Sequence, residues 1–195
     1  MQKKNFKPVI DTRTMAYCAM LTALSVALAR LAGLMPDEST RFSLEAIPIF
    51  LAGMLFGPLA GGLVGFSADF VGCLFSPFGF NPIFCVPPIL YGLFGGIFRR
   101  LLAKKVSIPR LLISFLPPVI LGSVLYQSFA LAFVYFSSTF TEGLILKLST
   151  RSVQFAITTV IDVLVIFFVF KAKIFDRMGI WPPKSRKQKG NEHER

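Results

Sequence analysis

The sequence predicts an all-α integral membrane protein with six transmembrane helices and both termini in the cytoplasm. Three observations carry this prediction: 54% of the 195 residues are hydrophobic, long apolar runs recur, and basic residues gather between the runs. A membrane-spanning helix needs roughly 20 apolar residues. The apolar runs lie at about 14–35, 42–75, 83–98, 111–136 and 144–170. They leave no room for a separate soluble domain.

The run 42–75 is too long for one span, and a Gly-Pro turn signal interrupts it at residues 56–62. Counted as one span, it would place the five basic residues of segment 99–110 outside the cell. Counted as two, it places every basic cluster in the cytoplasm, as the positive-inside rule requires. The charge distribution therefore favours a helical hairpin and six spans.

The same distribution sets the domain boundaries. We expect a six-helix membrane domain over residues 1–181, followed by a disordered, basic cytoplasmic tail over residues 182–195. The net charge of +11 lies in loops and tails, so a lipid bilayer is the expected partner and nucleic acid is not. A cleaved signal peptide ending near residue 29 is the alternative to an uncleaved first span, which the length of the first run favours.

Small residues mark helix faces in several spans. In the first span, Ala19, Ala23 and Ala27 recur every fourth residue, so another helix can approach closely there, either from this chain or from a partner. Gly-x-x-x-Gly spacings in the third span (residues 61 and 65) and the fourth (92 and 96) predict internal packing. Pro88 is expected to distort or delay the fourth helix.

The sequence offers no catalytic, cofactor or metal site. The three cysteines are isolated in apolar runs and fit small buried side chains. The sole histidine, His193, lies in the polar tail. No phosphate-binding Gly-x-x-x-x-Gly-Lys-Ser/Thr loop is present, so we do not expect the chain itself to bind ATP through such a loop.

Ionisable residues within the predicted spans are the strongest functional signal, because such groups are costly in a membrane. Four cations from three parts of the chain fall in the outer half, beneath an extracellular opening, and suit a ligand with carboxylates. The alternative is that they reach to the interface or pair with nearby acids. The cations are Arg30, Arg41, Lys147 and Arg151, and the acids at membrane depth are Glu45, Asp69 and Asp162.

Two further features suit a planar ligand. Asp69, near mid-membrane, can accept hydrogen bonds from a donor-rich heterocycle, or it can pair with a neighbouring helix. The outer connection at 75–84 is short and aromatic, and Phe78 and Phe80 can stack on a ring. The alternative for these aromatics is an interfacial anchor.

The block from Arg41 to Phe75, followed by an aromatic Gly/Pro loop and ILYGLFGGIFRRLL, resembles the folate-specific substrate-binding (S) component of energy-coupling factor (ECF) transporters. The resemblance implies a six-helix bundle with a vitamin pocket on the extracellular side. It also implies a multi-pass cell-membrane protein, not an enzyme, that works with a transmembrane coupling protein and two ABC-type ATPases.

The resemblance gives residues their roles. The alanine face, with Ala19, Ala23 and Ala27, would dock onto the coupling protein. For folate, the chemistry and depth of the residues assign ring recognition to Asp69, Phe78 and Phe80 and carboxylate recognition to Arg41 and Arg151. Arg30 is a further expected ligand-binding residue. The outer loop departs from the family pattern at residues 80–88, which border the pocket, so other vitamins stay open as ligands.

Other functions remain open at this point. The chain could bind riboflavin, thiamin or pantothenate in the same kind of machine. An intramembrane aspartyl protease using Asp69 and Asp162 is a distant alternative, since neither residue lies in the expected Gly-x-Gly-Asp motif. A purely structural membrane subunit would leave the outer cations unexplained.

Overall fold

The computed structural model describes residues 12–33, 44–75, 81–104, 106–135, 140–172, 175 and 180–181, and within these ranges its regular structure is helical, without strands. Its elements are α1 (Thr12–Gly33), α2 (Ala46–Phe56), α3 (Pro58–Leu74), η2 (Pro82–Cys85), α4 (Val86–Ile97), α5 (Arg99–Lys104), α6 (Ile108–Pro118), η3 (Val119–Tyr126), α7 (Gln127–Tyr135) and α8 (Phe140–Lys171).

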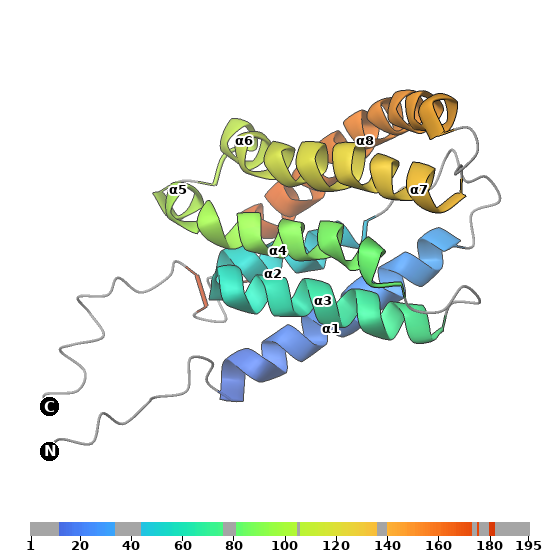
Figure 1. The fold of residues 1–195 in the computed structure, drawn as a ribbon. Coiled ribbons are helices and arrows are strands. Elements are labelled where there is room, and N and C mark those ends of the chain that lie inside the picture. The colour runs from blue at the N-terminus through green and yellow to red at the C-terminus, as the bar shows by residue number, and fades with distance from the viewer. Residues whose placement is uncertain are drawn as a thin grey trace, which may run out of the picture.

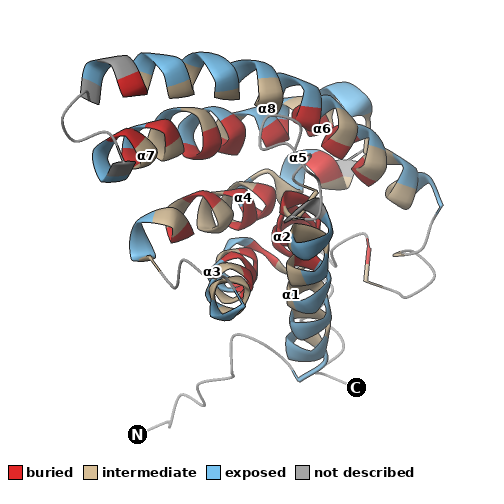
Figure 2. Ribbon diagram, turned by 90° about the vertical axis from the view of Figure 1, so that its right-hand side faces the viewer, coloured by how far each residue is buried: buried red, intermediate tan, exposed pale blue. Residues whose placement is uncertain are grey.

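Successive long elements cross the bundle in alternating directions, and α6, η3 and α7 together make one crossing (Figure 1). In this composite element, α6 and η3 contact α4, and α8 packs against the composite element and also contacts α2. On the other side, α3 contacts α4, and α1 contacts α3 and α2. Figure 2 shows that buried residues face the interior of this arrangement, whereas the outer faces of α1 and α8 are largely exposed.

The predicted hairpin is confirmed, because α2 and α3 are separate helices joined at Gly57. Gly57 has φ of 105°, a conformation that side-chain-bearing residues rarely adopt. Pro58 then occupies the first turn of α3, where a missing N–H costs nothing. The Gly-Pro pair thus ends one helix and starts the next without polar residues.

Glycines allow α2, α3 and α4 to pack backbone against backbone. A Cβ atom on Gly61 would overlap the carbonyl oxygen of Gly92, and one on Gly53 would overlap the same oxygen. The predicted internal role of the Gly-x-x-x-Gly faces is therefore confirmed. Every residue of α2 from Ala46 to Leu55 is buried, which makes α2 the central helix of the bundle.

Proline pairs shape the other crossings. Pro87 and Pro88 lie in the first turn of α4, after the short 3-10 helix η2, so the predicted delay of this helix is confirmed. Pro117 and Pro118 end α6, and the eight residues of η3 that follow form a π-helix. Such π-helical segments are rare and often accompany functional sites.

Within the part of the chain that the structure describes, three helical stretches are long and apolar enough to cross a membrane, namely Thr12–Leu31, Ile108–Val134 and Gly143–Lys171. The shorter apolar helices are Ala46–Phe56, Pro58–Leu74 and Pro82–Ile97. Many large apolar side chains lie exposed on the outside, among them Phe70, Phe133 and Phe168. Exposed apolar surface of this extent fits a helical membrane protein, and the count of six spans stays a prediction.

Candidate ligand-binding site

A cavity of about 100 Å³ lies inside the bundle, among α2, α3, α4, η3, α7 and α8. Its wall carries three carboxyl groups, those of Glu45, Asp69 and Asp162. Uncharged polar and aromatic side chains complete the wall, including Phe84, Tyr91, Ser123, Gln127 and Phe155. Small-molecule sites combine apolar and aromatic walls with convergent polar groups but usually enclose about 300–1,000 Å³, so this cavity alone is smaller than most.

Asp162 is the most deeply buried of these carboxyl groups. Only 2% of the residue is exposed, and its Oδ1 has no hydrogen-bond partner in the described part of the chain. Buried polar atoms are nearly always paired in native structures, so an unpaired one calls for an explanation. Both Asp162 and Phe155 of α8 face the cavity, separated by two helical turns.

Asp69 already has a partner within the protein. The thiol of Cys85 donates to its Oδ2 over 2.7 Å, and the Cys73 thiol lies 4.0 Å from the same oxygen. The structure therefore supplies the internal partner that the sequence left open. Asp69 nevertheless lines the cavity and remains accessible to a ligand there.

A polar chain links α4, η3 and α8 beside the cavity. The hydroxyls of Tyr91 and Ser123 share a hydrogen bond of 2.8 Å, and both residues are buried. Arg151 donates from Nη1 to the backbone oxygen of Ser123 at 3.4 Å, and its guanidinium lies 5.6 Å from the ring centre of Phe155. The π-helical segment thus places Ser123 where it holds a tyrosine and an arginine together.

A second cavity, of about 270 Å³, adjoins the first and shares Glu45 and Asp69 with it. Arg30 of α1 lines this second cavity. The Arg30 guanidinium donates to the backbone oxygen of Gly72 and lies 5.9 Å from the ring centre of Phe75. Arg30 therefore ties the end of α1 to the last turn of α3 and also offers charge to the cavity.

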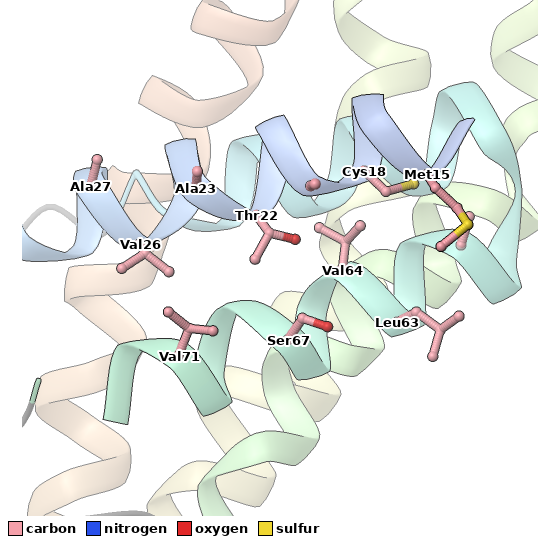
Figure 3. Close-up of a pocket in the computed structure, with 12 residues that line it drawn as sticks. Met15, Cys18, Thr22, Ala23, Val26, Ala27, Leu63, Val64, Ser67 and Val71 are labelled. Carbon is pink, nitrogen blue, oxygen red and sulfur yellow. The ribbon is translucent and has the colours of Figure 1, made fainter. Parts of the chain in front are cut away.

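The predicted alanine face borders an open, apolar groove of about 690 Å³ between α1 and α3. Ala19, Ala23 and Ala27 are all exposed. In Figure 3, Thr22 and Val26 point from α1 toward α3, whereas Ala23 and Ala27 point away from it. The three alanines are thus not covered by another described helix, and docking of a partner helix on them stays a prediction.

The structure brings part of the predicted site together. Asp69 and Arg30 line the adjoining cavities, and Arg151 contacts two residues that line the smaller one. Arg41, Phe78 and Phe80 lie outside the described residues. Lys147 does not line either of these two cavities.

Sequence reasoning did not assign several residues of the wall to the site. Asp162 was predicted only as an acid at membrane depth, and its position in the cavity wall makes it a candidate site residue. Tyr91, Ser123 and Gln127 carried no signal, because uncharged polar residues are unremarkable in an apolar helix. Among the described residues, no three His, Cys, Asp or Glu side chains are arranged to hold a metal ion.

Comparison with known proteins defines the class of this chain. Residues 9–174 match the family model described as "ECF-type riboflavin transporter, S component". The chain belongs to this family of transporter S components, and it is therefore a multi-pass protein of the cell membrane and not an enzyme. The predicted resemblance to ECF S components is confirmed, and the aspartyl protease alternative is wrong.

The chain is also similar to two individual proteins. The chain is 31% identical over 101 residues to "Folate transporter FolT" of Clostridium novyi (strain NT), an alignment covering 51% of this chain and 57% of that relative. It also matches the solved "Crystal structure of FolT bound with folic acid" with a TM-score of 0.63 and 25% identity, over 77% of this chain and 90% of the other. The FolT-like fold of this chain follows from the second match.

Proposed function

We propose that this chain is the substrate-binding subunit of an ECF-type importer and captures folate, or a reduced folate, from outside the cell for ATP-driven uptake. Its similarity to FolT on two independent comparisons supports the vitamin. The observation that carries the proposal is the internal cavity lined by three carboxyl groups, with arginine side chains nearby. Folate carries a donor-rich pterin at one end and glutamate carboxylates at the other.

The positions of Asp162 and Arg151 on α8 suit a ligand with hydrogen-bond donors at one end and carboxylates at the other. Asp162 and Arg151 lie eleven residues apart on one helix, which corresponds to about 16 Å along the axis. The two functional groups lie nearer to each other than these backbone positions, because the Arg151 guanidinium is 5.6 Å from the ring of Phe155, which lines the same cavity as Asp162. The pterin would lie against the carboxyl groups, and the glutamate would be bound by Arg151 and Arg30, with Arg41 as a further predicted contact. Phe78 and Phe80 stay predicted ring contacts.

Riboflavin is the second candidate, because the matching family model is named after it. The pyrimidine edge of a flavin presents two carbonyl oxygens around one N–H, whereas the corresponding edge of a pterin presents an amino group beside an N–H. A wall of three carboxyl groups accepts hydrogen bonds and repels carbonyl oxygens. The same wall therefore favours a pterin over a flavin.

We further propose six membrane spans with both termini in the cytoplasm, a membrane domain over residues 1–181 and a basic cytoplasmic tail over residues 182–195. The alternating direction of the helices is consistent with six crossings (Figure 1). The partners would be a transmembrane coupling protein, which would use the exposed face of Ala19, Ala23 and Ala27, and two ABC-type ATPases.

Mass spectrometry of the ligand that copurifies with the full chain tests the vitamin. We expect folate or a reduced folate after mild extraction, and isothermal titration of ligand-free protein should then show tight binding of folic acid and no heat from riboflavin. Copurification of a flavin, thiamin or pantothenate instead would overturn the folate assignment.

A further inference from the structure

We infer that Asp162 determines ligand specificity by accepting hydrogen bonds from the 2-amino group and the neighbouring N–H of the bound heterocycle. This role rests on the proposed function and deepens it, because it names the chemical group that the site selects. Three carboxyl groups line the cavity, and the structure distinguishes among them.

Asp162 is the carboxyl group with unused hydrogen-bonding capacity. Its Oδ1 is buried and has no partner among the described residues, although the side chain lines the cavity. Asp69 accepts from the Cys85 thiol, and Glu45 also makes interactions of its own within the protein. A ligand with hydrogen-bond donors gains the most binding free energy by donating to Asp162, because a buried acceptor without a hydrogen bond is costly.

The surroundings of Asp162 limit which donors can reach it. Tyr91 and Ser123 share their hydroxyls with each other, so neither is oriented only toward Asp162. The Arg151 backbone lies about three helical turns from Asp162 along α8, and its guanidinium contacts the backbone oxygen of Ser123 and the ring of Phe155. Among the described residues no donor is bonded to Oδ1 of Asp162, so a ligand can supply one, and two adjacent N–H groups match the two oxygens of one carboxyl group.

The carboxyl groups of the cavity wall also favour a ligand that carries a 2-amino group. A heterocycle with a carbonyl in place of the 2-amino group would turn an acceptor toward Asp162, with Glu45 and Asp69 close by. Sites built to hydrogen-bond a ligand donor reject analogues that lack it far more strongly than sites that recognise shape alone. Asp162 would thus separate aminopyrimidine ligands from flavin-like ones.

The first experiment compares two ligands and two proteins. Binding of folic acid, and of an otherwise identical analogue with a methyl group in place of the 2-amino group, is titrated calorimetrically against the full-length wild-type chain and Asp162→Asn. Asp162→Asn replaces one acceptor oxygen with an amide donor and removes that hydrogen bond to the ligand's amino group, a loss of roughly tenfold, so affinity should fall about tenfold for folic acid and much less for the analogue.

Control variants separate the possible outcomes. Ser114→Ala removes a buried hydroxyl that bonds only to the backbone of Arg110 in α6, and it should bind both ligands like wild type. Equal losses for both ligands in Asp162→Asn would overturn the inference, as would selective loss in Asp69→Asn alone. Failure of the wild type to bind folic acid would overturn the proposed function instead.

A stability measurement provides a second, independent readout. Oδ1 of Asp162 has no hydrogen-bond partner among the described residues. Asp162→Leu should therefore unfold at a higher temperature than wild type in the absence of ligand, while losing the stabilisation that folic acid gives. A lower unfolding temperature for ligand-free Asp162→Leu would mean that the carboxyl group has a structural partner, and would overturn the inference.

Discussion

Arg30 and Arg151 were both predicted from charge alone, yet the two arginines are held in different ways. Arg30 is exposed and ties α1 to the last turn of α3 through Gly72. Arg151 is partly buried and contacts the π-helical segment through Ser123. Charge in an apolar helix identified these residues as functional candidates, but only the packing of neighbouring helices decides what each one contacts.

Arg151 gives a prediction at this scale. Arg151→Met keeps the apolar stem of the side chain and removes its charge, so affinity for folic acid should fall at least about tenfold. Affinity for pteroic acid, which lacks the glutamate, should change little. Titration of both ligands against purified protein measures the difference.

The exposed Arg100 of α5 supplies the matched control. Arg100→Met should bind both ligands as the wild type does. If Arg151→Met weakened folic acid and pteroic acid equally, the arginine would be stabilising the protein or the ring site and would not be binding the glutamate.

Most of the side-chain contacts that could not be predicted from the sequence involve uncharged polar residues. Tyr91 of α4 and Ser123 of η3 lie 32 positions apart in sequence and form a buried hydrogen bond. Nothing in the pattern of either helix indicates this pairing, because a single hydroxyl barely changes hydropathy. Likewise, the partner of Asp69 is a cysteine that was interpreted only as a small buried side chain.

Among the elements, α1 is the least enclosed and α2 the most. Of the strongly apolar part of α1, only 6% is buried, whereas α2 is buried along nearly its whole length. The alanine spacing predicted that α1 presents a face for close approach, and its exposure beside the α1–α3 groove fits a partner helix. The π-helix after Pro118, by contrast, had no sequence signal beyond the proline pair.

The alanine face leads to a prediction about transport. Ala23→Trp should leave folic acid binding nearly unchanged but abolish ATP-driven uptake in vesicles that contain the complete importer, since a bulky ring blocks close helix approach. Leu24→Trp, at a neighbouring exposed position outside the face, should transport normally. Loss of folic acid binding in Ala23→Trp would place this face in the ligand site.

The glycine contacts predict a difference in stability between two otherwise similar substitutions. Gly61→Ala puts a Cβ into the Gly92 carbonyl oxygen and should destabilise the protein by about 1–3 kcal/mol, the usual cost of overpacking. Gly72→Ala meets nothing within 4 Å and should be neutral or slightly stabilising. Thermal unfolding in detergent compares them, and equal unfolding temperatures would contradict the close packing of α3 on α4.

For the whole molecule, the charge of the loops predicted the helical hairpin, and the motif resemblance predicted the family, which residues 9–174 confirm. Loop charge and motif resemblance can both be recognised in the sequence because each extends over a long stretch of the chain. The cavity could not be predicted in this way, because its wall draws one to three residues from each of α2, α3, η2, α4, η3, α7 and α8. The shapes of these contacts depend on helix rotation, which no local pattern specifies.

The proposed topology is tested with epitope tags in intact spheroplasts. A tag at either terminus should be hidden from antibody until the membrane is permeabilised, and a tag inserted between Pro36 and Asp37 should be accessible from the start. Opposite accessibility of the two terminal tags would mean an odd number of spans and contradict the six-span arrangement.

The contacts among Gly53, Gly61 and Gly92 also constrain how such a protein can diverge. Each glycine excludes side chains from a position where another helix backbone lies, so none can change alone without moving a whole helix. The cavity wall has no such restriction, because its residues project into open space from helices that are already fixed. A lineage built on this scaffold can therefore acquire a new vitamin by exchanging a few wall residues while its three glycine-packed helices stay as they are.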